Sequence, residues 1–326
     1  MRKITSLFLL ITLFYAGQVR AQQDTIISYM RNMYVGYEMI RVTPIENKDS
    51  ADFIRRITKP DTSAGSNLFP VTDYYLNGKP KLIGTLVMGK FTADLEGSCI
   101  EFYPSGQKKI ICSYKNGRRE GDAIAYYTNG KIYETGKYYQ GQLVLASCND
   151  STGKVLAENG NGWWIKLISD YKTLLQEGEV VDGLEDGEWK YYPSDDIYCI
   201  CQYRRGELIS GISYDKQGNK YPFTSFEMQP EFEGGVQGFT KFLQKNSHYP
   251  SDAKARKIQG RVILTFVIEK DGSLTGIRVV RSIDLLLDEE AIRVLKLSPP
   301  WKPGLQNGRP VRVQYTVPIN FSLPGG

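Results

Sequence analysis

Histidine is almost absent from this chain of 326 residues, which has only His248. A Ser-His-Asp type of active site or a histidine-containing zinc site would have to use this one imidazole, yet the surrounding segment NSHYP has no nucleophile motif. We interpret His248 as a surface or capping residue. Paired carboxylates, phosphate-binding loops and metal-ligating clusters are also missing, so the sequence predicts a protein that is not an enzyme and uses no cofactor or metal.

Cysteine is scarce as well, and its spacing fits neither zinc binding nor redox catalysis. Two of the cysteines are two residues apart, which in a strand points both side chains to the same face, and we expect the cysteines to be small buried side chains. An oxidising compartment would allow one disulfide, and the odd number leaves at least one thiol unpaired; the pairing stays open. The five residues are Cys99, Cys112, Cys148, Cys199 and Cys201.

Long hydrophobic runs are missing beyond the first 21 residues. That segment has Arg2 and Lys3, then the apolar run ITSLFLLITLFYA, and then the small residues Val19 and Ala21 at the cleavage positions, as in a secretory signal peptide (residues 1–21). The apolar run has 13 residues, whereas a membrane span needs about 20, so cleavage is favoured over an anchor. We expect a protein of the periplasm or cell envelope, or an inner-membrane protein if the signal is not cleaved.

A basic stripe of the kind that binds nucleic acid is missing too. The net charge of +5 includes three positive residues of the predicted signal peptide, and in the rest of the chain Lys and Arg outnumber Asp and Glu only in residues 231–326. There the basic residues are spread over predicted strands and loops, which argues against nucleic-acid binding. The change in charge along the chain predicts a domain boundary.

Glycine and tyrosine are abundant, with 32 and 22 residues, and indicate many short strands and turns. The segments EGSCIEFYPSG (96–106) and EGDAIAYYTNG (120–130) repeat with an offset of 24 residues, and a looser copy, DGEWKYYPSDD, begins at Asp186. Each copy predicts a β-hairpin whose turn places glycine at positive φ and whose aromatic side chains cover the next hairpin. We expect an all-β repeat array over residues 71–222; within residues 22–70, which have no clear assignment, DFIRRITK indicates a short helix.

Two segments of this array carry a family resemblance. GEVVDGLEDGEWKYY (178–192) resembles the MORN-type repeat, and NGKIYETG resembles the related hairpins of YwqK-like proteins. This resemblance implies that the repeats form an interaction or scaffold surface.

The C-terminal part contains two helix signals. Phe239, Phe242 and Leu243 lie at helical spacing, and Pro250 ends this first helix. Asp288 is predicted to cap a second helix, which the prolines at 299 and 300 end.

Three strand signals accompany these helices. The segment GRVILTFVIEKDGSLTGIRVVRS (260–282) alternates apolar and polar residues on both sides of Asp271 and Gly272, which predicts a hairpin with a two-residue turn. The last strand, residues 311–321, places six apolar residues on one face. The predicted order is helix, strand, strand, helix, strand.

This C-terminal part resembles the C-terminal domain of TonB, and the segment PEFEGG that precedes the matching segments is typical of the Bacteroidota versions. The matching segments are YPSDAKARKIQGRVILTFVIEKDG, RVVRSIDLLLDEEAIRVLKLSPPWKPG and GRPVRVQYTVPINF. The resemblance implies an α+β domain over residues 223–326, with two helices packed on a three-stranded antiparallel sheet. The family motif residues are Tyr249, Pro250, Gly260, Asp271, Gly272, Trp301, Pro303 and Gly304.

TonB proteins transmit energy to outer-membrane receptors, and their terminal strand accepts the receptor's TonB box as an added strand. The resemblance therefore implies TonB-dependent receptors or other envelope proteins as partners, and it allows a homodimer through the TonB-like domain. An exposed sheet edge suits strand addition, and Pro318 suits an edge strand because it lacks an N–H. The predicted peptide-binding residues are Val311, Arg312, Val313, Gln314, Tyr315, Thr316 and Val317.

Two usual features of an energy transducer, an uncleaved anchor and a proline-rich linker, are not found in this sequence. The sequence therefore predicts an exported TonB-like interaction protein, with energy coupling to transport as a stronger form of the same function. The alternative is an envelope scaffold that binds proteins through its repeats without energy transduction.

Overall fold

The computed structural model describes residues 25–35, 38–60, 63, 65, 67–88, 93–168 and 171–323. The predicted signal peptide and its cleavage site lie outside these residues. Along the part of the chain that is described, no helix is long and apolar enough to cross a membrane. The chain divides into two compact units, Met1–Leu174 with Val180–Leu184, and Leu175–Glu179 with Glu185–Gly326.

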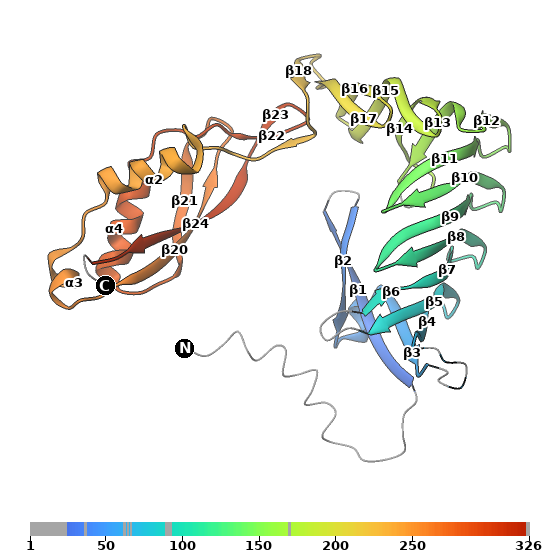
Figure 1. Cartoon of the computed structure of the whole chain (residues 1–326), viewed down its shortest axis with the longest axis horizontal. Coiled ribbons are helices and arrows are strands. Elements are labelled where there is room, and N and C mark those ends of the chain that lie inside the picture. Colours follow the sequence, from blue (N-terminus) through green and yellow to red (C-terminus); the bar gives the residue numbers. More distant parts are fainter. Residues whose placement is uncertain are drawn as a thin grey trace. The chain divides into compact units, whose positions relative to one another are not determined.

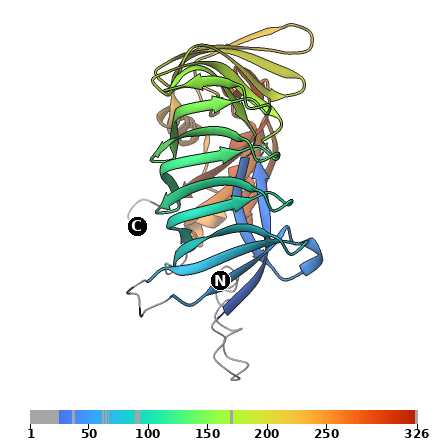
Figure 2. The same ribbon diagram turned by 90° about the vertical axis from the view of Figure 1, so that its right-hand side faces the viewer.

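The first unit is built from antiparallel strands, most of which pair with their neighbours in sequence. In Figure 2 the strands of residues 69–167, coloured from cyan to green, lie one above the next. The elements are β1 (Thr25–Val35), β2 (Glu38–Ile45), η1 (Lys48–Ser50), β3 (Phe53–Thr58), β4 (Phe69–Tyr75), β5 (Pro80–Met88), β6 (Ala93–Leu95), β7 (Gly97–Phe102), β8 (Lys108–Lys115), β9 (Arg118–Tyr126), β10 (Ile132–Tyr139), β11 (Gln142–Asn149), β12 (Val155–Glu158) and β13 (Asn161–Leu167).

The segment DFIRRITK is a strand, so the prediction of a short helix there was wrong. It forms β3, which pairs with both β1 and β4. Phe53 and Ile57 are buried, and Arg55 between them also points inward, where it makes a bidentate ion pair with the buried Asp73 at 2.8 Å. An arginine on the buried face interrupts the alternation of apolar and polar residues that would predict a strand. The carboxylate that pairs with it lies on another strand, so the local sequence does not indicate its burial.

Two kinds of turn alternate along the repeats. Asn116 and Gly117 form a two-residue turn with both φ values positive (52° and 74°), as in a type I′ turn. At the other end of the hairpin, Tyr103 and Gln107 close a three-residue loop, in which the Gly106 amide donates to the Tyr103 carbonyl and the Gly106 φ is 92°. Both turns confirm the predicted need for glycine at positive φ.

In three of the three-residue loops, the residue before the loop is a tyrosine that links one hairpin to the next. The hydroxyl of Tyr75 donates to the Phe102 carbonyl at 2.7 Å, that of Tyr103 to the Tyr126 carbonyl at 2.6 Å, and that of Tyr127 to the Asn149 carbonyl at 2.8 Å. The donor and acceptor residues of these three bonds are 27, 23 and 22 residues apart in the sequence. The repeated aromatics are therefore structural links between units.

The glutamate carboxylate of each repeated Glu-Gly pair links successive hairpins at the other end of the strands. Glu96 accepts a hydrogen bond from the Asn116 amide at 2.7 Å, and Glu120 accepts one from the Gln140 amide at 2.9 Å. The repeated sequence thus encodes contacts between successive hairpins as well as the hairpins themselves.

The second unit contains the looser repeat copy and the C-terminal α+β part. In the repeat copy, Trp189 is fully buried, and its indole N–H donates to the Glu179 carbonyl at 2.8 Å. The β elements of this repeat region are β14 (Leu174–Val181), which both units share, β15 (Leu184–Ser194), β16 (Ile197–Arg204), β17 (Glu207–Tyr214) and β18 (Lys220–Phe223).

The C-terminal part has the predicted order of helices and strands, with a short third helix and a small hairpin in addition. The three-stranded sheet has the order β21-β20-β24 (Figure 1). Its elements, with those around it, are β19 (Glu227–Met228), α2 (Gly235–Asn246), α3 (Ser251–Ala255), β20 (Gly260–Ile268), β21 (Leu274–Arg281), α4 (Leu285–Lys296), β22 (Gly304–Gln306), β23 (Arg309–Val311) and β24 (Val313–Phe321).

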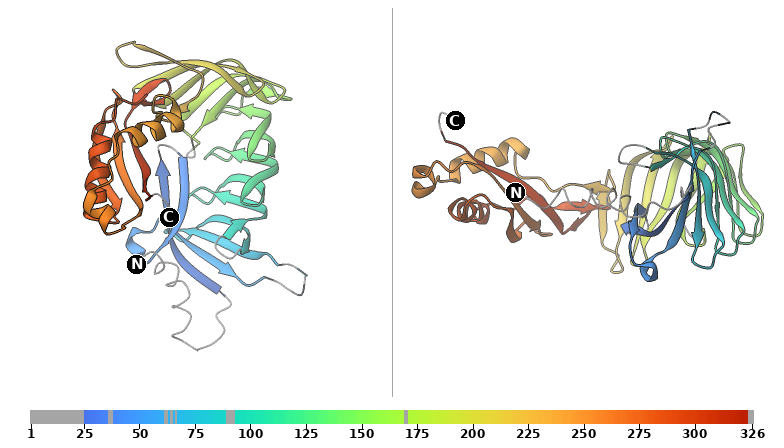
Figure 3. Two further views of the ribbon diagram at one scale, coloured as in Figure 1. Left: turned by 60° about the vertical axis from the view of Figure 1, so that its left-hand side comes forward. Right: turned by 90° about the horizontal axis from the view of Figure 1, so that it is seen from below.

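The core of this part lies between the helices and one face of the sheet. The ribbon views in Figure 3 show the helices alongside the strands of this sheet. α4 contributes four fully buried apolar residues, and α2 packs three partly buried ones against them. The α+β fold class, with helices packed on a three-stranded antiparallel sheet, is confirmed. The buried apolar residues of β20, α4 and β24 are Val262, Leu264, Phe266, Ile268, Leu287, Ala291, Val294, Leu295, Val317, Ile319 and Phe321.

Two local predictions in this part were wrong. α4 is capped by Asp284, whose carboxylate accepts from the Leu286 amide at 3.1 Å, and Asp288 lies one turn further on and is buried. The turn between β20 and β21 has three residues, because the Glu269 amide donates to the Ser273 carbonyl at 2.9 Å. Its geometry matches that of the three-residue loops in the repeats.

The boundary predicted between residues 222 and 223 lies inside the second compact unit. Asn307, in the turn between β22 and β23, accepts a buried hydrogen bond from the Ser213 hydroxyl at 2.7 Å and donates its amide to the Phe226 carbonyl at 2.7 Å. The C-terminal part is therefore in contact with the last repeat strands, and its independent folding stays a prediction.

Candidate functional site

The strand predicted to bind peptides lies at an edge of the three-stranded sheet. β24 pairs with β20 over nine consecutive residues without a bulge, from Phe321 opposite Gly260 to Val313 opposite Ile268. Among the described strands, β20 is its one neighbour. Its other edge therefore carries backbone N–H and C=O groups that no strand of this sheet pairs with.

The predicted strand from Val311 to Phe321 is interrupted at Arg312. Val311 ends β23 and pairs with Gly304 in the small sheet of β19, β22 and β23, and the chain then passes through Arg312 into the larger sheet. Five of the seven predicted residues lie on the edge strand itself. They are Val313, Gln314, Tyr315, Thr316 and Val317.

One hydrogen bond shows which backbone groups of β24 face outward. Thr265 on β20 donates its hydroxyl to the Tyr315 carbonyl at 3.1 Å, so this carbonyl faces β20. In an antiparallel strand each residue points its N–H and C=O to the same side, and the next residue points them to the other. The backbone groups of Gln314 and Thr316 therefore face away from β20.

Pro318 falls in the same outward-facing set. It lies opposite Ile263 and has the parity of Gln314 and Thr316, so its missing N–H costs the β20 ladder no hydrogen bond. This placement explains why a proline is tolerated inside a nine-residue strand. It also means that the outward edge offers no donor at this position.

The side chains of β24 follow the same alternation. Val317, Ile319 and Phe321 point into the core, whereas Gln314 and Thr316 are exposed. The residues that offer their backbone outward thus also present their side chains to solvent, on the sheet face opposite the core.

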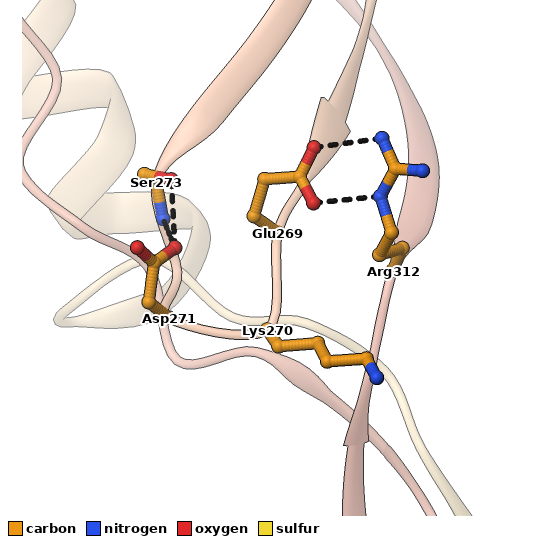
Figure 4. A pocket seen from close by; sticks show the side chains of 5 residues that line it. All are labelled: Glu269, Lys270, Asp271, Ser273 and Arg312. Carbon is orange, nitrogen blue, oxygen red and sulfur yellow. Dashed lines mark hydrogen bonds and ion pairs between the residues drawn. The ribbon is translucent and has the colours of Figure 1, made fainter.

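An ion pair fixes the residue that precedes β24. Arg312 makes two hydrogen bonds to the Glu269 carboxylate, at 2.6 and 2.8 Å, and they lower the pKa of Glu269 below its ordinary value (Figure 4). Lys270, Asp271 and Ser273 complete a depression of about 380 Å³ around this pair. The Ser273 hydroxyl and amide bind Asp271 at 2.7 and 2.9 Å and so order the turn.

Trp301 connects the β20–β21 turn to the edge strand. Its ring centroid lies 5.9 Å from that of Phe266 and 5.5 Å from that of Tyr315, and its amide donates to the Gly272 carbonyl at 2.8 Å. At Gly272, φ is 84° and an added Cβ would lie 1.9 Å from the Trp301 carbonyl oxygen. This turn therefore admits only glycine.

The other motif residues also have structural roles. A Cβ added at Gly304 would lie 2.6 Å from the Val313 side chain, so this glycine lets β22 approach the start of β24. At the far end, Tyr249 packs edge-on against Phe321, with ring centroids 5.9 Å apart. The three remaining motif residues occupy element boundaries: Pro250 caps α3, Gly260 begins β20, and Pro303 precedes β22.

Sequence reasoning missed Glu269 and Thr265, which fix the position of Arg312 and the orientation of Tyr315. Both lie on or directly after β20, and their partners lie 43 and 50 residues further along the chain. Only the register between β20 and β24 brings these pairs together, and no local pattern reports it.

Comparisons with known proteins find similarity for segments of both the repeats and the C-terminal part. Residues 245–323 match the family model for the Gram-negative bacterial TonB protein C-terminal, and residues 95–116 and 119–140 match that for the MORN repeat variant. No protein among those with curated descriptions matches the sequence.

Two solution structures of the Helicobacter pylori TonB C-terminal domain are similar to 28% of this chain. One, of residues 179–285, is 26% identical, is covered over 82% of its length and has a TM-score of 0.23. The other, of residues 194–285, is 27% identical, is covered over 96% and has a TM-score of 0.22. By the two family matches alone, residues 245–323 are similar to the TonB C-terminal family, and residues 95–116 and 119–140 are similar to the MORN repeat variant.

Proposed function

We propose that this protein binds an extended peptide of an outer-membrane receptor, of the TonB-box type, by adding it as a strand to the outward edge of β24. The observation that carries this proposal is the row of unpaired backbone groups at Gln314 and Thr316. Main-chain pairing with such a row provides affinity, and the exposed side chains beside it provide selectivity. The match to the TonB C-terminal family supports the same choice.

The edge also limits the length of the docked segment. Gln314 and Thr316 each offer a donor and an acceptor, but Pro318 offers only its carbonyl, so pairing weakens at that point. We expect an ordered peptide segment of only a few residues, centred on Gln314 and Thr316. Binding should be weak, since a short strand buries little area and a free peptide loses conformational entropy when it docks.

In this proposal the chain is exported and acts in the cell envelope, where its partner is a TonB-dependent receptor. The repeat array would serve as the spacer between the peptide-binding domain and other envelope components. Energy-coupled transport is the stronger form of the proposal, and it requires a further partner that reaches the inner membrane.

The test is an NMR titration of the isotope-labelled mature chain with a TonB-box peptide. We expect the amide signals of Gln314 and Thr316 to shift, because their N–H groups gain a partner. Replacing Gln314 by proline removes one of these donors and should abolish binding. Chemical-shift changes confined to the repeats or helices, with both amides unmoved at saturating peptide, would contradict the proposal.

Two variants control this experiment. Gln314→Ala keeps the N–H and should change the affinity only modestly, which separates main-chain from side-chain recognition. Tyr315→Pro removes a donor that faces β20 and should destabilise the domain, whereas Gln314→Pro should leave it folded. If both proline variants unfold the domain equally, the assignment of inward and outward groups is wrong.

A second candidate function is an envelope scaffold that binds proteins through the repeats. Exposed aromatic side chains of the array favour it: Tyr139, Trp163 and Tyr198 are 52%, 41% and 44% exposed. A pull-down of envelope proteins with the wild type and with Gln314→Pro separates the candidates. Receptors captured by the wild type and lost by the variant support strand addition, whereas an unchanged set of partners supports the scaffold.

A further inference from the structure

Two of the five cysteines face each other across neighbouring strands. In the register of β7 and β8, Cys99 lies directly opposite Cys112, between the pairs Ser98–Ser113 and Ile100–Ile111. Directly opposed residues of an antiparallel pair place their side chains on the same face. All five thiols are free in the structure.

The other cysteines have no cysteine opposite them. Cys148 lies opposite Glu134 and Ala157. The two cysteines of β16 are separated by one residue on the same strand, and they lie opposite non-cysteine residues of β15 and β17. Their partners are Tyr191 and Ser213 for Cys199, and Trp189 and Gly211 for Cys201.

The backbone geometry of the opposed pair suits a covalent bond. Opposed residues in an antiparallel sheet have Cα atoms about 4.5–5.5 Å apart, and disulfides span Cα distances of about 4.4–6.8 Å. Opposed Cβ atoms lie about 4.5–5.5 Å apart, and a disulfide holds them about 3.5–4.5 Å apart. The bond therefore requires rotation of the two side chains and a small local approach of the two strands.

The surroundings leave room for the bond and protect it. A Cβ added at Gly84 on β5 would lie 3.5 Å from the Cys99 sulfur, so the glycine brings no side chain against this sulfur from that strand. Cys99 packs in an apolar cluster with Val71 and Leu86, and the exposed fractions of Cys99 and Cys112 are only 1% and 2%. A disulfide, which has no N–H or O–H group to satisfy, fits the apolar side of this site. On the side of Cys112, Tyr114 and Arg119 also hydrogen-bond to the Glu101 carboxylate, at 3.5 and 3.0 Å, and keep this partner when the bond forms.

We propose that Cys99 and Cys112 form a cross-strand disulfide when the chain folds in an oxidising compartment, and that this is the one disulfide of the protein. The oxidant is a disulfide donor. One cysteine thiolate attacks the donor disulfide and releases one donor thiolate, and the second cysteine thiolate then attacks the protein sulfur of the mixed disulfide and releases the other. The two cysteines lose two electrons and two protons in total, and the donor becomes two thiols.

The bond forms before the sheet closes over the sulfurs. Burial raises the pKa of Cys99 to about 12 and that of Cys112 to about 11, so the folded protein contains little of the reactive thiolate at neutral pH. Folded reduced protein should therefore resist oxidation, and the completed disulfide should resist reductants while the array stays folded.

The pairing is tested by refolding reduced, denatured full-length chain in a glutathione redox buffer. Free thiols are then alkylated under denaturing conditions, and the peptides are mapped by mass spectrometry. We expect Cys148, Cys199 and Cys201 to be alkylated and one cross-linked peptide pair to contain Cys99 and Cys112. Five alkylated cysteines, or any other pairing, would overturn the inference.

Matched variants sharpen this result. Cys148→Ala should keep the cross-link, and Cys112→Ala should leave all four remaining cysteines open to alkylation. Refolding in vitro needs no export, so this experiment tests the disulfide pairing separately from the proposed envelope function. Only the formation of the disulfide in the cell depends on that function. Exported protein that carries the cross-link supports both, whereas a cross-link formed in vitro but missing from cellular protein supports the pairing and contradicts export to an oxidising compartment.

Discussion

Replacing Trp301 by alanine should strongly destabilise the C-terminal part of the protein. Trp301 is 5% exposed, and four aromatic rings surround it, with centroid distances of 5.2–5.9 Å. Truncating a buried tryptophan costs about 3–5 kcal/mol, and we expect the upper half of this range because rigid rings cannot collapse into the space. The four rings belong to Phe232, Phe239, Phe266 and Tyr315.

The assay is urea unfolding of the mature chain, followed through the amide NMR signals of β20 and β24, which report on this part alone. Trp301→Phe is the matched control: it keeps an aromatic ring and loses the indole hydrogen bond to the partly buried Ser298 hydroxyl, so it should cost less than half as much. A loss below about 1 kcal/mol for Trp301→Ala, the size of an average substitution, would refute the reasoning that this ring ties the β20–β21 turn to the edge strand.

Three further predictions concern the rest of the chain. Burial raises the pKa of Glu134 from the ordinary 4.5 to about 7. Between these pH values the folded protein binds more protons than the unfolded chain, so it loses stability as the pH rises. The melting temperature should therefore fall from pH 5 to pH 8, and less steeply in Glu134→Gln. Residues 223–326 should fold alone, and a fragment without cooperative unfolding would contradict the predicted boundary. Mass spectrometry of exported protein should find an N-terminus at Gln22, whereas one at Met1 would support an anchored protein.

The architecture of the C-terminal part could be predicted because its signals are local. Alternation along β20 and β24 and helical spacing in α2 each depend on a few neighbouring residues. The errors arose where a distant partner decides the local structure. Arg55 points inward only because Asp73 meets it from β4, and Asp284 competes with Asp288 for the helix cap with no local pattern to separate them.

The candidate site was only partly predictable for the same reason. The sequence alone indicates that β24 has an apolar face, but which backbone groups face outward depends on its register with β20. Pro318 is the exception, since a residue without an N–H is expected in the outward set.

The hydrogen bonds that link successive hairpins have a consequence for the length of the array. The units that carry Tyr75, Tyr103 and Tyr127 are each bound by the tyrosine hydroxyl to the unit that follows, and these bonds need nothing from more distant units. Neighbouring strands are about 4.8 Å apart, so inserting one more two-strand unit would lengthen the array by about 10 Å and leave its two ends chemically unchanged. The length of the array can therefore be altered in fixed increments, by gene duplication or by design, without any change to the sequence of β24.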